Sequence, residues 1–186
     1  IGRIAGHRDV SMTSSATLLC VVDPAASANV YDTKTGVLTR ITDTDYQKSD
    51  TCVFQDGYFV FTLSDQDLFF VSNIEDPQNI DPLLVGSAEV KPDKIVSAYV
   101  SHNELHILGT ESIEVFRNSG GAGFPFSRVP GMLINAGCLA RKAIVEMKSS
   151  YAFLGTKKGK ACILYNTGND VLKISTPPID EYLQRY

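Results

Sequence analysis

The sequence lacks several features that mark particular classes of protein. It contains no tryptophan and only 3 histidines. No apolar run reaches the ~18 residues of a membrane-spanning helix. Its 17 lysines and arginines are outnumbered by 21 aspartates and glutamates, which gives a net charge of -4. Because attraction to phosphate needs surplus positive charge, the composition disfavours a general nucleic-acid binder, and no membrane contact is expected.

The beginning of the chain lacks a basic segment followed by an apolar one, so we expect no secretion signal. The chain starts at Ile1 without a methionine, and we interpret it as an internal piece of a longer protein. With 44% hydrophobic and 20% charged residues, it is expected to bury a core of its own.

Metal-binding motifs are also absent from the sequence. The cysteines stand singly in or beside apolar runs, at Cys20, Cys52, Cys138 and Cys162, with no C-x-x-C pair. We interpret them as buried free thiols of a protein in a reducing compartment. His102 and His106 are predicted on one strand, where a spacing of four residues puts side chains ~13 Å apart, too far for one metal ion.

Short apolar runs separated by polar turns fill the sequence. In the segment 88–116, three such runs at 95–100, 105–108 and 113–116 are joined by turns of two or three residues. Runs of this length with turns of this kind predict consecutive antiparallel hairpins rather than helices.

The pattern recurs in four successive units, at about residues 10–42, 52–86, 95–128 and 143–175. Tyr58, Leu105 and Tyr151 hold the same place after the first turn of their units, at intervals of 47 and 46 residues. The tripeptide Leu-Gly-Thr also recurs 46 residues apart, at 108–110 and 154–156. A repeat of this length with three or four short strands is typical of a β-propeller blade, and a β-sandwich is the alternative architecture.

We therefore predict an all-β protein with β-propeller blades of short antiparallel strands, about four of them, within residues 1–176. Residues 177–186 depart from the pattern. Thr176 is a suitable N-cap residue, and the two prolines that follow suit the first turn of a helix. This end is predicted to be a short helix that links the propeller to further sequence.

Candidate residues for chemistry are few. Acidic residues occur in pairs on three predicted loops: Asp43 and Asp45, Asp65 and Asp67, and Glu75 and Asp76. None of the pairs has the third oxygen ligand and the glycine of a calcium loop. The Gly-rich segment 119–123 lacks the lysine of a phosphate-binding loop and is predicted to be a slack connection. Because the sequence contains no nucleophile motif, we predict that the protein is not an enzyme and binds no metal or cofactor.

One basic cluster, Lys157, Lys158 and Lys160, lies in the segment Thr-Lys-Lys-Gly-Lys. It is predicted at the tip of a hairpin, where lysines commonly stay solvated and protect an edge strand. A contact with DNA phosphate or with an acidic partner is the functional alternative.

Short motifs follow one another at 56–58, 70–76, 87–89, 92–95, 112–116, 137–138, 150–153 and 179–186. Their order and spacing resemble the packaged-DNA stabilisation proteins of short-tailed bacteriophages. The resemblance covers most of the chain from about Val10. It is weakest before Cys52 and in the Gly-rich segment.

This resemblance implies a structural role in the virion tail. Members of the family are tail hub (plug) proteins that assemble in the host cytoplasm as a ring of six copies below the portal and its adaptor. They hold the packaged genome in and seat the tail needle and tailspikes. The implied fold is a β-propeller, and the implied partners are the adaptor (head-completion), needle and tailspike proteins. Packaged DNA is expected to pass nearby without specific binding.

The resemblance also marks residues for which both an interface role and a fold role stay open: Ser72, Asn73, Asp76, Glu89, Pro92, Asp93 and Glu114. For Glu114, which lies between two residues expected to face inward, we predict an outward side chain. The alternative function is a propeller that binds or cleaves a glycan. The lack of tryptophan disfavours it, because sugars usually stack on aromatic platforms.

Overall fold

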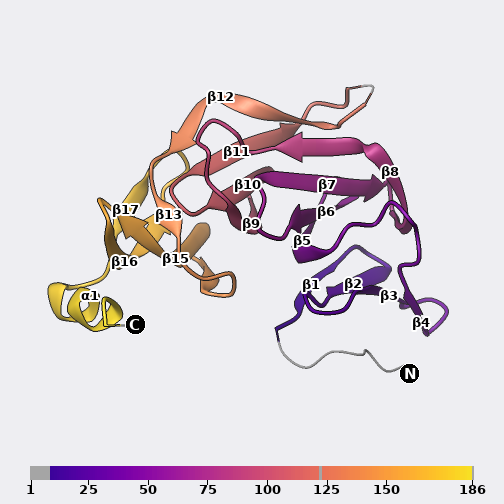
Figure 1. Ribbon diagram of the computed structural model, residues 1–186, viewed down its shortest axis with the longest axis horizontal. Coiled ribbons are helices and arrows are strands. Elements are labelled where there is room, and N and C mark those ends of the chain that lie inside the picture. Colours follow the sequence, from indigo (N-terminus) through magenta and orange to yellow (C-terminus); the bar gives the residue numbers. More distant parts are fainter. Residues whose placement is uncertain (1–8, 122, 186) are drawn as a thin grey trace. The chain divides into compact units, whose positions relative to one another are not determined.

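The structure is a computed structural model that describes residues 9–121 and 123–185. These residues form 17 β-strands in four antiparallel sheets and one short helix (Figure 1). The chain divides into two compact units, residues 1–87 with 118–127 and residues 88–117 with 128–186. The predicted all-β fold of blade-like sheets with a short C-terminal helix is confirmed.

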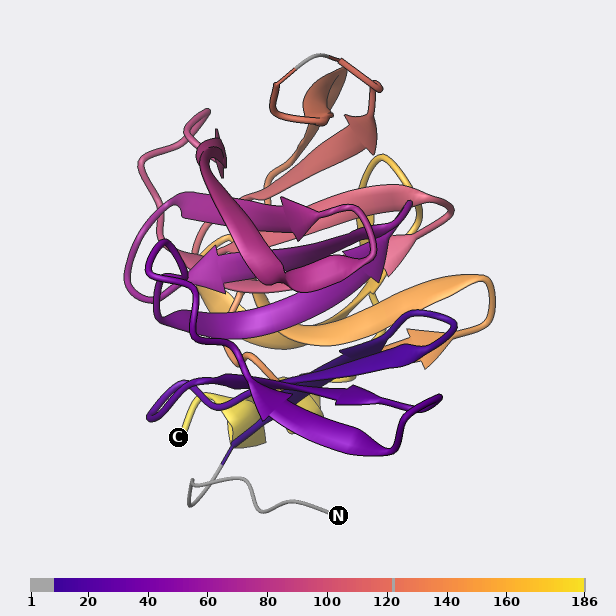
Figure 2. The ribbon, with the colours of Figure 1, turned by 90° about the vertical axis from the view of Figure 1, so that its right-hand side faces the viewer.

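The first unit holds two four-stranded sheets, which appear as successive layers in Figure 2. The first sheet consists of β1 (Ser11–Ser14), β2 (Leu18–Val22), β3 (Ala28–Asp32) and β4 (Val37–Arg40). The second consists of β5 (Ser49–Gln55), β6 (Tyr58–Leu63), β7 (Leu68–Asn73) and β8 (Asp76–Ser87). The predicted two-residue turn joins β5 to β6, and its residues Asp56 and Gly57 have φ of 50° and 88°, as such turns require.

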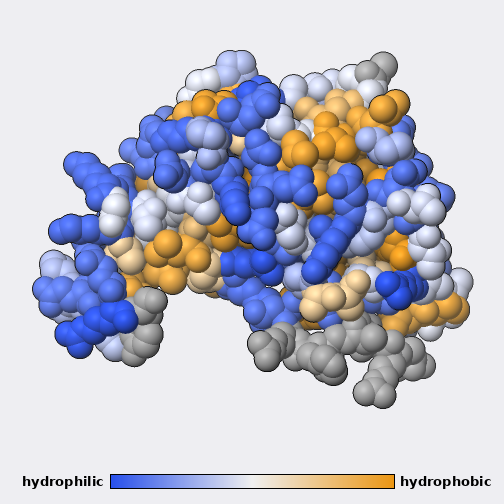
Figure 3. Space-filling model, viewed as in Figure 1, coloured by the Kyte–Doolittle hydropathy of each residue, from blue (hydrophilic) through white to orange (hydrophobic). Residues whose placement is uncertain are grey.

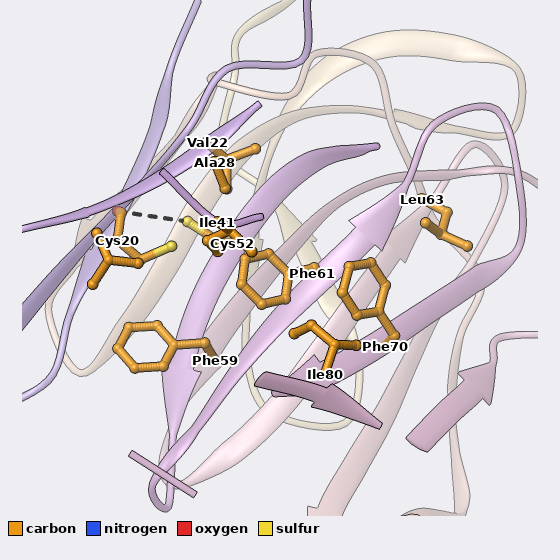
Figure 4. Close-up of a cluster of buried hydrophobic side chains, with 11 residues drawn as sticks. Cys20, Val22, Ala28, Ile41, Cys52, Phe59, Phe61, Leu63, Phe70 and Ile80 are labelled. Carbon is orange, nitrogen blue, oxygen red and sulfur yellow. Dashed lines mark hydrogen bonds between the residues drawn. The ribbon is translucent and has the colours of Figure 1, made fainter. Parts of the chain in front are cut away.

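The core of the first unit lies between these two sheets (Figure 4). Phe59, Phe61 and Phe70 are buried in it, and Phe61 stacks on Phe70 with ring centroids 5.0 Å apart. Cys20 and Cys52 come from opposite sheets, and the Cys52 thiol points at the Cys20 carbonyl oxygen at 3.9 Å. The hydrogen bond with Cys52, together with burial, raises the pKa of the Cys20 thiol well above its ordinary value. All four cysteines are buried free thiols, as the sequence predicted.

Residues 118–127 pack back onto the first unit. Phe124 meets Phe69 edge to face with ring centroids 5.5 Å apart, and Phe126 meets Tyr58 in the same way at 5.8 Å. Each such pair adds ~0.5–1.5 kcal/mol beyond the area it buries. The Gly-rich segment, predicted to be a slack connection, precedes these two aromatic residues in the chain.

The second unit holds most of one sheet and all of another. The first consists of β9 (Ile95–Ser101), β10 (Glu104–Gly109), β11 (Ile113–Asn118) and β12 (Phe126–Ile134), in the order β12-β11-β10-β9. The other consists of β13 (Gly137–Cys138), β14 (Ile144–Met147), β15 (Ser150–Lys157), β16 (Lys160–Asn166) and β17 (Val171–Lys173). Helix α1 (Pro177–Leu183) follows and contacts β16.

The repeated Leu-Gly-Thr tripeptide has one structural cause in both sheets of this unit. A Cβ atom on Gly109 would lie 2.4 Å from the Asp93 carboxylate, and one on Gly155 would lie 2.4 Å from the Gly137 carbonyl oxygen. Only glycine lets the neighbouring segment approach this closely. The 46-residue spacing of the two tripeptides therefore reflects a glycine that is closely approached by a neighbouring segment in each sheet.

A buried polar chain joins the two sheets of the second unit. Asn166 Nδ2 donates to the Tyr151 hydroxyl at 3.1 Å, and that hydroxyl lies 3.0 Å from His106 Nδ1, to which it can donate its own proton. The three side chains are at most 2% exposed. Burial lowers the pKa of His106 to about 4, so the imidazole is neutral near pH 7 and able to accept at Nδ1.

Candidate functional site

The residues that the family resemblance marked fall in two groups, one in each unit. In the first unit, Ser72, Asn73 and Asp76 surround the turn from β7 to β8. The Ser72 hydroxyl accepts from the Phe59 amide at 3.1 Å and donates to the Asn73 carbonyl at 2.7 Å. Asp76 accepts from the Gln78 amide at 3.1 Å. These contacts lie within the sheet and stabilise its turn.

In the second unit, the Asp93 side chain likewise stabilises a turn. Its carboxylate is 8% exposed and accepts hydrogen bonds from the amides of Glu111 and Ser112 at 2.7 and 2.8 Å. It thereby holds the turn between β10 and β11, against Gly109. Glu89 and Pro92, which precede it in the sequence, are exposed.

Glu114 differs from its prediction. We expected an outward side chain, yet Glu114 is 2% exposed. Its carboxylate accepts from the Val90 amide at 2.8 Å and from Arg128 Nε at 2.6 Å, and the Arg128 guanidinium lies 5.5 Å from the centre of the Phe116 ring. The alternation along β11 does turn Glu114 away from its apolar neighbours, but Arg128 and residue 90 cover that face.

The acidic pair Asp43 and Asp45 is part of a loop cap. The Asp43 carboxylate accepts from the amides of Asp45 and Ile80 at 2.8 and 3.1 Å, and these bonds lower its pKa. Over residues 9–121 and 123–185, no three histidine, cysteine or acidic side chains gather in a way that could hold a metal ion. The same residues contain no helix long and apolar enough to cross a membrane.

The basic cluster lies at the hairpin between β15 and β16, as the sequence predicted. Lys157 is paired with Lys160 across the hairpin, and Lys158 occupies the turn with φ of 55°. Lys157 Nζ donates to the Val171 carbonyl at 2.6 Å and lies 3.7 Å from Asp170 Oδ1. The hairpin tip is therefore attached to β17, while Lys158 and Lys160 remain exposed.

A hollow of about 550 Å³ opens beside this hairpin. It is lined by Lys157, Lys158, Lys160, Cys162, Val171, Leu172, Lys173 and Asp180, and is called the lysine hollow below. Lys173 forms an ion pair with Asp180, and this bond, followed by one from Ser175, lowers the pKa of Asp180. On the face of the molecule that Figure 3 shows, mainly hydrophilic side chains lie over α1, and hydrophobic surface lies beside it.

Two members of the lysine hollow were missed in the sequence. Lys173 and Asp180 lie 13 or more residues beyond Lys160, and they join the cluster because β17 pairs with β16, with Lys173 opposite Leu164. The turn residues between 166 and 171 could have predicted this pairing of β16 with β17. The hollow thus collects four ammonium groups, with the carboxylates of Asp170 and Asp180 beside them, on a chain whose net charge is -4.

The chain is thus an all-β protein of propeller blades, in which Ser72, Asp93 and Glu114 make contacts within the fold. The family described as "Bacteriophage P22 Gp10, beta-propeller" matches residues 1–186, so the chain belongs to this family of phage stabilisation proteins. It is accordingly a structural component of a bacteriophage virion that serves to stabilise packaged DNA. No curated protein matches the sequence significantly.

Solved structures of similar fold are distant in sequence. The computationally designed Ika4 protein is 18% identical with a TM-score of 0.53, over 88% of this chain and 95% of that one. The dihydro-heme d1 dehydrogenase NirN is 9% identical with a TM-score of 0.60, over 94% of this chain and 38% of that one. The extracellular domain of a hybrid two-component system from B. thetaiotaomicron is 11% identical with a TM-score of 0.54, over 90% and 22% of the two chains. At these identities the likeness concerns the fold alone.

Proposed function

We propose that the chain is part of a tail hub protein, which plugs the portal channel after DNA packaging and seats the tail needle and tailspikes. The observation that carries the proposal is the family match along residues 1–186. In the proposed role the chain is a scaffold and not an enzyme. It works through contacts with the portal adaptor, the needle and the tailspikes, in a ring of six copies.

Three physical features support such a role. Ser72, Asp93 and Glu114, which the family resemblance singled out, form hydrogen bonds inside the fold. Such contacts suit a rigid scaffold better than a reactive site. The four buried thiols suit a chain that folds in the reducing cytoplasm of the host before it enters the virion. A net charge of -4 also limits adhesion to DNA that passes through the channel.

The test is the mass of the longer parent protein by light scattering, alone and mixed with portal–adaptor rings of the same phage. We expect co-elution as one ring complex with six copies of the parent protein. A monomer that ignores the rings would contradict the proposal. Binding to a glycan array by the same preparation would instead favour a glycan-binding propeller.

A further inference from the structure

The lysine hollow combines positive charge with apolar lining residues. Cys162 and Val171 line it and are each 3% exposed, whereas Leu172 is 58% exposed. A large apolar side chain this exposed among lysines offers contact area to a ligand. The volume of about 550 Å³ falls within the ~300–1,000 Å³ of sites that enclose a small ligand or a few residues of peptide.

The four lysines are not equivalent. Lys157 and Lys173 are held by groups of the chain itself, the Val171 carbonyl and the Asp180 carboxylate. Lys158 and Lys160 stand exposed on the hairpin tip, and Lys160 is near enough to lower the pKa of Asp180 by its charge. The first pair shapes the hollow, and the second pair is presented to a ligand.

We propose that the lysine hollow binds an acidic peptide segment of a partner protein. Carboxylates of the segment pair with Lys158 and Lys160, and an apolar side chain beside them packs on Leu172. Charge complementarity directs this choice, because four lysines gather in the hollow on a chain that is acidic as a whole, and they attract negatively charged segments from a distance.

A nucleic acid fits the same hollow less well. A phosphate backbone gains nothing from the apolar surface of Leu172, and Asp170 and Asp180 repel its closely spaced charges. A peptide can place its carboxylates beside the lysines and keep them away from both aspartates. The lysine hollow therefore favours a peptide ligand over a DNA ligand.

The inference rests on the proposed function only for the source of the partner, which would be a neighbouring protein of the tail. Binding of a probe peptide tests the hollow itself, and the mass of the ring complex tests the tail hub role. If the ring forms but no peptide binds, the hollow inference alone is overturned. If peptide binds but no ring forms, the tail hub proposal alone fails.

The experiment titrates the 186-residue chain into a fluorescein-labelled peptide of alternating glutamate and leucine, followed by fluorescence anisotropy at low salt. Three probes accompany it: the same peptide with glutamine for glutamate, one with serine for leucine, and a single-stranded oligothymidine of similar length. We expect the glutamate–leucine peptide to bind tightest. The double substitution Lys158→Gln, Lys160→Gln should weaken its binding about fivefold or more.

A matched control uses lysines outside the hollow. Lys148 occupies the turn between β14 and β15 with φ of 54°, like Lys158 with 55°, and Lys34 is exposed on the turn between β3 and β4. The double variant Lys148→Gln, Lys34→Gln removes the same charge and should leave binding unchanged. Equal binding of the glutamine peptide, tighter binding of oligothymidine, or equal losses in both variants would overturn the inference.

Amide chemical shifts locate the bound peptide independently of the variants. On titration with the glutamate–leucine peptide, the amides of residues 158–162 and 171–173 should shift, while those of the turn at Lys148 should not. Shifts confined to other parts of the chain would overturn the assignment to the hollow.

Discussion

At the scale of single residues, Glu114 and Glu104 lie on neighbouring strands and meet very different surroundings. Glu114 on β11 is covered, and its carboxylate binds Arg128 and the Val90 amide. Glu104 on β10 binds Arg117, whose side chain is 61% exposed. Since water screens the second pair, we expect the two arginines to contribute very different amounts to stability.

The first prediction compares these arginines. Arg128→Met leaves the Glu114 charge without its ion-pair partner, so it should lower the free energy of unfolding by about 2–3 kcal/mol. Arg117→Met, the control, should cost less than about 1 kcal/mol. Adding Glu114→Gln to Arg128→Met removes the buried charge and should restore part of the loss. Urea unfolding followed by circular dichroism measures all four proteins, and equal costs for the two arginines would contradict the interpretation.

A second prediction concerns the glycine of the Leu-Gly-Thr repeat. Gly109→Ala puts a methyl group where the Asp93 carboxylate lies, so Asp93 must move and release the turn that it holds. We expect a loss of about 1–3 kcal/mol in urea unfolding. Gly121→Ala is the control, because its nearest neighbour is 3.8 Å from the added Cβ and its φ is not positive. An unchanged midpoint for Gly109→Ala would show that the close approach is not needed.

At the scale of elements, the buried chain from Asn166 through Tyr151 to His106 ties β16 and β15 to β10. The pKa of His106 in the folded protein is about 4, below the ordinary value of ~6.5. The unfolded chain therefore takes up a proton between these values before the folded protein does. It follows that the contribution of His106 to stability is complete above pH ~6.5 and is lost as the pH falls toward 4.

The third prediction follows from this sign. Between pH 6.5 and 4 the wild-type protein should lose about 3 kcal/mol more than the His106→Gln variant, because only the wild type has this proton to bind. His102→Gln, at an exposed histidine four residues earlier, should keep the wild-type slope. The measurement is urea unfolding at steps of pH. Parallel slopes for wild type and His106→Gln would refute the assignment.

The elements themselves were largely predictable, and their contacts were not. Hairpins such as 95–100 with 105–108 depend on local turn chemistry, which a sequence displays directly. Glu114 is covered by the Arg128 side chain, which lies fourteen residues further along the chain, after a long connection. His106, the hydrogen-bond partner of Tyr151, is 45 residues away in the sequence. Such contacts depend on how sheets pack, and no local pattern encodes that packing. For the same reason the hairpin lysines were predicted, while Lys173 and Asp180 were missed.

At the scale of the whole molecule, the thiols offer a simple probe of the cores. Cys138 is 1% exposed and burial raises its pKa to about 11, and burial likewise raises the pKa of Cys162. Because the thiolate is the reactive form, buried thiols of raised pKa react slowly. Cys20, Cys52 and Cys138 lie in the cores, so the sheets around them must separate before these thiols meet a reagent. Cys162 lines the lysine hollow but is only 3% exposed, so its thiol is also poorly accessible.

The fourth prediction is that the native protein at pH 7.5 hardly reacts with Ellman's reagent over minutes, whereas in urea all 4 thiols react at once. Ser149→Cys, at the exposed turn between β14 and β15, is the control and should give one fast thiol in the native protein. Fast reaction of the unmodified native chain would contradict the closed cores described above.

The buried polar chain distinguishes the sheets of the second unit from those of the first. Repeated sheets with the same hairpin pattern are at risk of pairing with the wrong neighbour while they fold. The interface in the first unit is aromatic and sulfur-rich, around Phe59 and Cys52, whereas that in the second requires the partners of the Tyr151 hydroxyl. A mispaired sheet would strand that hydroxyl among hydrocarbons at a cost of about 1–3 kcal/mol. The buried polar chain therefore opposes pairing of the second unit's sheets with those of the first unit.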